Sequence, residues 1–205
     1  MSDPDLDTQT IEKAKISQLI ADWGMWRDAG DWDRLRSTYT ADATMATSWM
    51  DGTAADFIDG CRQIDAGSSG GFSAQHLIGA STIDINGKRA SAATRVSVLI
   101  RLSVHGIESD LTAIGRFHDL LLRTGPNWRI RRRVPVFDKD FVRPVNPAAT
   151  LHLDEKELSG FPAAYRFLCY VESGRGMKIN PNLPAPNSPA ISELYAQARA
   201  WVDGK

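Results

Sequence analysis

Cysteine is scarce in this sequence, and long apolar runs are missing. Two cysteines in 205 residues, Cys61 and Cys169, are too few for a disulfide framework. Each lies in an apolar helical pattern, so we expect both to be reduced core residues. No apolar run is long enough to span a bilayer, and the acidic N-terminus lacks the apolar segment of a secretory signal. These absences favour a cytoplasmic protein with no membrane partner.

An excess of charge of one sign is also missing. The 24 basic and 25 acidic residues leave a net charge of −1, which creates no overall field that would recruit nucleic acid. The only basic run, Arg131–Arg133, falls on an expected strand, so its side chains alternate between two faces. We interpret the run as a solvated or ion-paired edge, with anion binding by Arg131 or Arg133 as the alternative.

Motifs for metals and cofactors are absent as well. The cysteines and histidines have no spacing that suits zinc, and no glycine-rich loop opens a helix to cradle a phosphate. We therefore expect no metal site and no cofactor. The length suits one domain with a substantial core and an added arm.

Hydrophobic periodicity divides the chain into helices followed by strands. Residues 1–9 are expected to form a flexible tail, and helical spacing predicts three helices before residue 67. Alternation then predicts four long strands between Gln75 and Phe137, joined by short turns, of which Asn86-Gly87 is the clearest. This order indicates an α+β protein whose helices pack on one face of a curved, mostly antiparallel sheet.

Proline punctuates the chain after Phe137, which sets residues 139–205 apart as a C-terminal extension. Pro162 opens one expected helix, and Ser188-Pro189 has the chemistry of a helix start for another. The last helix carries a single apolar stripe, and such a stripe must be buried. We expect the extension to dock on its own domain or on a partner subunit.

Asp28 stands out at the end of the first helix. It lies beside the apolar stripe that contains Trp23 and Trp26, one turn after Gly24. Because Gly24 has no side chain to crowd that turn, the Asp28 carboxylate could point into a cavity. The alternative is a solvated aspartate near a helix end.

Four passages resemble the nuclear transport factor 2-like fold, also called cystatin-like, and SnoaL-like domains in particular. They are Asp28-Ala-Gly-Asp-Trp-Asp-Arg-Leu running into Tyr39-Thr-Ala-Asp-Ala; Gly52 with Phe57-Ile58; Gln75-His-Leu-Ile-Gly79 with Asp84-Ile-Asn-Gly87; and Gly115-Arg-Phe-His-Asp119 with Arg123 and Trp128-Arg-Ile130. The resemblance covers residues 10–138. It implies three helices packed on a strongly curved sheet that forms a cone-shaped pocket.

The resemblance also implies a site. In scytalone dehydratase and hexachlorocyclohexane dehydrochlorinase patterns, an aspartate late in the first helix pairs with a histidine that opens the strand after the third helix. The matching positions here are Asp28 and His76. Such a pair implies a cofactor-independent lyase or isomerase that removes a proton from a small, mostly apolar, cyclic substrate. Candidate walls of the pocket are Trp23, Tyr39, Trp49, Phe57 and Phe117, and ordinary core packing is the alternative for each.

The sequence departs from the dehydratase pattern in one respect. Tyrosines surround the substrate in those enzymes, but Trp26 and Phe117 stand at two of the matching positions here. No general acid can therefore be assigned, and Asp119 and Asp138 are weak alternatives as bases. A non-catalytic small-molecule-binding domain and an oligomerisation module remain rival hypotheses. We expect a homodimer or homotrimer in each case, because a broad curved sheet leaves one face to cover.

Overall fold

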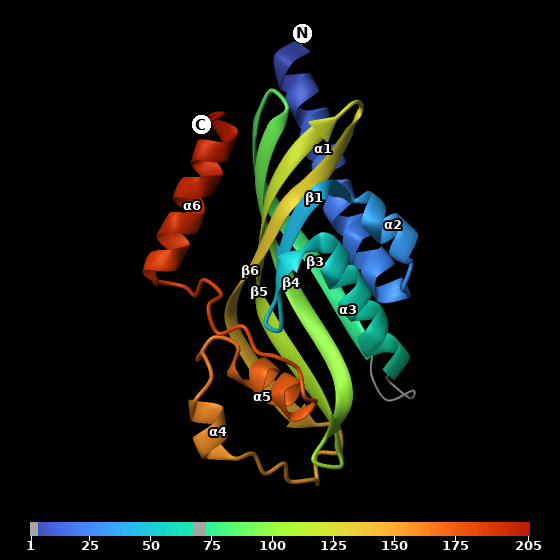
Figure 1. The fold of residues 1–205 in the computed structure, drawn as a ribbon, viewed down its shortest axis with the longest axis vertical. Coiled ribbons are helices and arrows are strands. Elements are labelled where there is room, and N and C mark those ends of the chain that lie inside the picture. Colours follow the sequence, from blue (N-terminus) through green and yellow to red (C-terminus); the bar gives the residue numbers. More distant parts are fainter. Residues whose placement is uncertain (1–3, 68–72) are drawn as a thin grey trace.

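The computed structural model describes residues 4–67 and 73–205 and shows an α+β fold built on one strongly curved sheet (Figure 1). Six strands follow the order β2-β1-β6-β5-β4-β3, with β1 parallel to β6 and the other neighbours antiparallel. The strands are β1 (Tyr39–Ala46), β2 (Asp51–Thr53), β3 (Ser73–Asn86), β4 (Arg89–Val104), β5 (Ile107–Thr124) and β6 (Asn127–Pro144). The expected helices followed by hairpins are therefore present.

Three helices cover one face of this sheet: α1 (Pro4–Ala29), α2 (Trp32–Ser37) and α3 (Ala54–Gly67) (Figure 1). Ile16, Ile20 and Trp23 of α1 are at most 1% exposed, which agrees with the apolar stripe read from the sequence. The helix begins at Pro4, so residues 4–9, expected as a tail, are helical. Residues 67–71, which are rich in glycine and serine and therefore predict a loop, lie outside the described residues beyond Gly67.

The strand turns follow the sequence closely. Gly87, Gly106 and Gly125 each have a positive φ, which is the conformation that tight hairpin turns need. The register shifts between Ile114 and Gly115, and a Cβ built on Gly115 would lie 2.2 Å from the carbonyl oxygen of Val136. Such bulges bend strands, so this glycine lets β5 and β6 curve together.

The C-terminal extension begins later than expected, because residues 139–144 continue β6 and pair with β5. Beyond Pro144 it forms α4 (Glu155–Ser159), α5 (Arg166–Gly174) and α6 (Pro189–Val202). It packs on its own domain. Helix α5 lies against one end of β5 and β6, and α6 covers the sheet face opposite α1 (Figure 1). The buried residues of α6 are Ile191, Leu194 and Ala198, the stripe expected from the sequence. Helix α5 thereby closes the lower end of the cone.

None of the helices in the described part of the chain combines the length and apolar character that crossing a bilayer requires.

Candidate functional site

Asp28 and His76 meet where α1 crosses β3. A Cβ on Gly24 would lie 2.8 Å from Cγ1 of Ile78, so the missing side chain lets the helix approach the strand closely. One turn later, the Asp28 carboxylate reaches the backbone and the side chain of His76. The two residues are hereafter called the dyad. The close approach at Gly24 thus positions Asp28. The sequence analysis expected Gly24 to leave room for the Asp28 carboxylate, whereas in the structure it leaves room for Ile78 of β3.

Both carboxylate oxygens of Asp28 hold His76. The His76 backbone N–H donates to Oδ2 at 2.6 Å, and ring Nδ1 lies 2.6 Å from Oδ1. Because a carboxylate only accepts hydrogen bonds, Nδ1 carries the proton and Nε2 is left as the acceptor of the neutral ring. The side chains of His76 and Asp28 are 12% and 20% exposed. The structure brings the predicted pair together with a defined tautomer.

His76 lines an apolar cavity of about 120 Å³ inside the cone. Cavities of about 150 Å³ lined by apolar side chains bind benzene, so this volume suits one small ring. Four of the five predicted aromatic walls line it: Trp23, Trp49, Phe57 and Phe117. Their rings form a continuous group, with centroids 5.2 to 6.1 Å apart.

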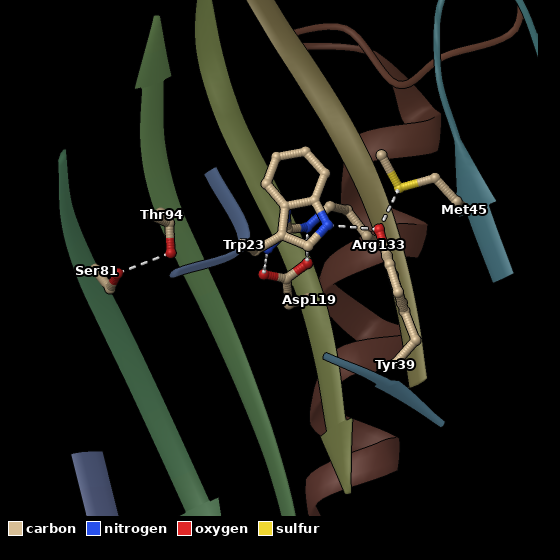
Figure 2. Close-up of polar contacts among 7 residues, drawn as sticks. All are labelled: Trp23, Tyr39, Met45, Ser81, Thr94, Asp119 and Arg133. Atoms are coloured by element: carbon tan, nitrogen blue, oxygen red, sulfur yellow. Dashed lines mark hydrogen bonds and ion pairs between the residues drawn. The ribbon is translucent and has the colours of Figure 1, made fainter. Parts of the chain in front are cut away.

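Tyr39, the fifth predicted wall, lies in the core behind Trp23 and does not line the cavity (Figure 2). Its hydroxyl accepts a hydrogen bond from Trp23 Nε1 at 2.6 Å and faces the sulfur of Met45 at 3.7 Å. Burial raises the pKa of Tyr39 far above its usual range. Tyr39 therefore positions the Trp23 indole.

Arg133, expected at a strand edge, is fully buried behind the aromatic wall (Figure 2). Its guanidinium forms two hydrogen bonds of 2.7 Å with Asp119, which is also fully buried. The guanidinium carbon lies 4.2 Å from the ring centroids of both Trp23 and Phe117. The ion pair supports the aromatic wall from behind and does not line the cavity, which argues against anion binding by Arg133 and against Asp119 as a base.

Arg131, the other candidate for anion binding, and Asp138, the other candidate base, also form ion pairs within the protein. Arg131 pairs with Asp42 at 3.0 Å, and Asp138 pairs with Arg116 at 2.9 Å. Within residues 4–67 and 73–205, no group of three histidine, cysteine or acidic side chains could hold a metal ion. Cys61 lines the cavity, but burial raises the pKa of its thiol to about 11, so it stays neutral.

Glu172 is the cavity residue that sequence reasoning missed. It lies on α5, is 9% exposed, and lines the same cavity as His76. Ser48 Oγ donates to Glu172 Oε1 at 2.7 Å, whereas Oε2 is buried without a hydrogen-bond partner among the described residues. Burial raises the pKa of Glu172 to about 8. Its spacing in the sequence could have identified Glu172 as an inward-facing residue. It follows Leu168 by four residues and therefore shares the apolar face of the expected helix.

Comparisons with known proteins agree with this architecture. The chain is 30% identical to pea pathogenicity protein 2 of Fusarium vanettenii over 210 aligned residues, which cover 97% of this chain and 89% of that protein. A PEP2-like protein of the same fungus matches with the same identity and coverage. These matches extend through the C-terminal extension.

Solved structures show the same fold at low sequence identity. A putative scytalone dehydratase from Novosphingobium aromaticivorans is 18% identical, with a TM-score of 0.57 over 72% of this chain and 99% of that one. A type 2 hexachlorocyclohexane dehydrochlorinase is 16% identical, with a TM-score of 0.54 over 73% of this chain and 97% of that one. The fold is the cystatin-like, nuclear transport factor 2-like fold that the sequence indicated. Since the SnoaL-like domain matches residues 9–134, more than half of its length, the chain belongs to the SnoaL-like domain family.

Proposed function

We propose that this protein is a cofactor-independent lyase or isomerase that removes a proton from a small, mostly apolar, cyclic substrate. The observation that carries the proposal is the geometry of His76, whose Nδ1 lies 2.6 Å from Asp28 while the ring lines an apolar cavity. The names of two structures with this fold, a dehydratase and a dehydrochlorinase, support elimination as the reaction class.

His76 is the base in this proposal. Neutral Nε2 takes a proton from carbon, and the ring becomes an imidazolium. Asp28 is a positioning residue, because it holds Nδ1–H, fixes the tautomer and stabilises the imidazolium. The apolar walls screen charge poorly, so this stabilisation is stronger than it would be in water. Loss of a β-leaving group then gives a lyase, whereas return of the proton elsewhere gives an isomerase.

The cavity limits the substrate to about one six-membered ring with few polar groups, given its volume of about 120 Å³. Two probes fit that description. Cyclohexanone reports proton removal through exchange of its α-hydrogens in D₂O, followed by NMR. 3-Hydroxycyclohexanone reports elimination through the absorbance of the enone product.

We expect the wild type to accelerate exchange and elimination above the buffer rate. His76→Ala should lower both rates by about 10²- to 10⁴-fold, the usual contribution of a positioned base. Asp28→Asn should lower them by about tenfold or more, and it should change the ratio of His76 tautomers in ¹⁵N NMR, which loss of stability alone would not do.

A non-catalytic binding domain gives a different result. Binding of cyclohexanone is followed through the indole N–H signals of Trp23 and Trp49, which line the cavity. Probes that bind at this site but are neither exchanged nor eliminated faster than in buffer would contradict the proposal and favour the binding domain. Equal rates for wild type and His76→Ala would contradict the role of His76.

A further inference from the structure

The C-terminal extension contributes a carboxyl group to the cavity that the dyad serves. Glu172 on α5 lines this cavity with His76, and it carries the only carboxyl group among the described residues that do so. One of its oxygens accepts a hydrogen bond from Ser48 Oγ at 2.7 Å. The other is buried and has no partner within the described part of the chain. Buried polar atoms almost always have partners, so this one requires an explanation.

We propose that Glu172 is the general acid of the site, a neutral carboxylic acid whose O–H protonates a hydroxyl group as it leaves the substrate. The inference rests on the proposed function, because the leaving group departs from a substrate that His76 deprotonates. It narrows the substrate to a cyclic compound with a hydroxyl group β to the acidic carbon. The torsion that orients a glutamate carboxyl is broad, so the O–H can be aimed at a bound oxygen.

The surroundings of Glu172 keep it protonated at neutral pH. Its burial is the main cause of the raised pKa of about 8, the negative charge of Asp140 on β6 adds to it, and the serine hydrogen bond opposes it. Burial also raises the pKa of Tyr165, which precedes α5, and of Cys169, which lies on α5, to about 12 each, so both side chains are neutral. Two guanidinium groups also line the cavity, Arg175 directly after α5 and Arg27 on α1, and Arg27 pairs with Asp65 at 3.4 Å. A neutral acid is what protonation of a leaving group requires.

Other O–H and S–H groups of the cavity are weaker acids. The described lining residues with such groups, apart from Glu172, are Thr47, Ser48 and Cys61. Ser48 already donates its proton to Glu172, and the Cys61 thiol has a pKa raised to about 11 by burial. Tyr39, the tyrosine expected among the pocket walls, hydrogen-bonds Trp23 from behind and does not line the cavity. Glu172 is therefore the best-matched proton donor.

The step balances with 3-hydroxycyclohexanone as the substrate. His76 Nε2 takes a proton from C2, and the electrons of that C–H bond form the C2=C3 double bond. The C3–O bond breaks, and the hydroxyl leaves as water with the proton of Glu172. The products are cyclohex-2-enone and water. Transfer of one proton from the imidazolium to the Glu172 carboxylate through solvent restores both groups.

The first test compares two leaving groups. Chloride leaves as the anion and needs no proton, whereas a hydroxyl group needs a proton from an acid to leave as water. Enone formation is measured from 3-hydroxycyclohexanone and 3-chlorocyclohexanone, with spontaneous rates subtracted. Glu172→Gln should lower kcat/KM for the hydroxy compound by about 100-fold or more, and far less for the chloro compound. His76→Ala should lower both. Glu155→Gln, the same change at an exposed site on α4, is the matched control.

The outcomes separate the two proposals. If His76→Ala lowers both rates and Glu172→Gln lowers neither, the dyad stands and the role of Glu172 is overturned. An equal loss for both compounds in Glu172→Gln also overturns it, because that pattern indicates a structural role. No enzymatic turnover of either compound contradicts the proposed function itself.

A second test does not depend on turnover. The affinity for cyclohexanone is titrated by NMR between about pH 6 and pH 9 in the wild type and in Glu172→Gln. Dividing the wild-type affinity by the Glu172→Gln affinity at each pH cancels the contribution of His76, which both proteins retain. This ratio should fall by about tenfold as Glu172 ionises in the wild type, because a carboxylate cannot donate a hydrogen bond to the ketone oxygen. A constant ratio, or no saturable binding in either protein, overturns the inference.

Discussion

Replacing Glu172 by glutamine should change how the stability of the protein depends on pH. In the folded protein burial raises the pKa of Glu172 from 4.5 to about 8. Between these values the unfolded chain loses the proton that the folded protein keeps. Stability therefore falls by about 1.4 kcal/mol per pH unit as pH rises from about 5 to about 8, and the contribution is fully present only below about pH 4.5.

Glutamine has the same shape, still accepts the hydrogen bond from Ser48, and does not titrate. The free energy of unfolding of Glu172→Gln should therefore rise relative to wild type by about 4 kcal/mol from about pH 5 to about pH 8, an upper value because the site can relax. For a chain of this length, that difference moves Tm by roughly 8–16 °C.

The assay is urea or thermal unfolding at half-unit pH steps, with Glu155→Gln as the exposed control. Asp140, whose burial raises its pKa to about 6, titrates in all three proteins, so differences between variants cancel most of its effect. A wild-type minus Glu172→Gln difference that stays constant within about 0.5 kcal/mol over this range would refute the reasoning, because Glu172 would then ionise alike in the folded and unfolded states.

Replacement by alanine should have different effects at three glycine positions. Gly115→Ala places a Cβ 2.2 Å from the Val136 carbonyl oxygen, so we expect a loss of about 3 kcal/mol or more in urea unfolding, against less than about 1 kcal/mol for Gly174→Ala, which meets nothing within 4 Å. Gly24→Ala meets Cγ1 of Ile78 at 2.8 Å, and about 1 kcal/mol of gained helix propensity offsets part of the clash. Its stability should change little, while probe turnover should fall about tenfold because α1 moves away from β3; unchanged turnover would show that the dyad tolerates the shift.

The fold could be predicted because its causes are local, whereas the pairing of Asp28 with His76 was expected from the family resemblance. Hairpin turns need glycines at fixed positions, and the turn predicted at Asn86-Gly87 forms there, with Gly87 at a positive φ. The proximity of Asp28 and His76 depends on a helix period, a glycine one turn earlier and a strand that follows the third helix. Each of these features can be read from a short segment, and the family resemblance supplied the pairing between segments.

Arg133 and Tyr39 were misplaced because their environments depend on pairing between distant segments. Alternation places Arg131 and Arg133 on the same face of the strand and Arg132 on the other, but it does not show that Arg133 pairs with a buried Asp119. The two side chains face each other because β5 and β6 pair in a particular register, which shifts between Leu120 and Leu121. Tyr39 opens β1 and lies beside Ile130 of β6, a pairing between distant segments that the sequence does not show, so its side chain was assigned to the wrong surroundings.

Glu172 could not be predicted as a site residue because it lies in the C-terminal extension, outside the part of the chain that carries the family resemblance. The SnoaL-like match ends at residue 134, and the dyad lies within it, but α5 lies beyond it. In the proposed mechanism the domain holds the group that takes a proton from carbon, and the extension holds the group that gives one to the leaving oxygen. Under that proposal, changing α5 should alter the leaving groups that the site accepts without disturbing the dyad. On this argument the extension, rather than the domain, is the place to look for differences in substrate among chains that share this fold.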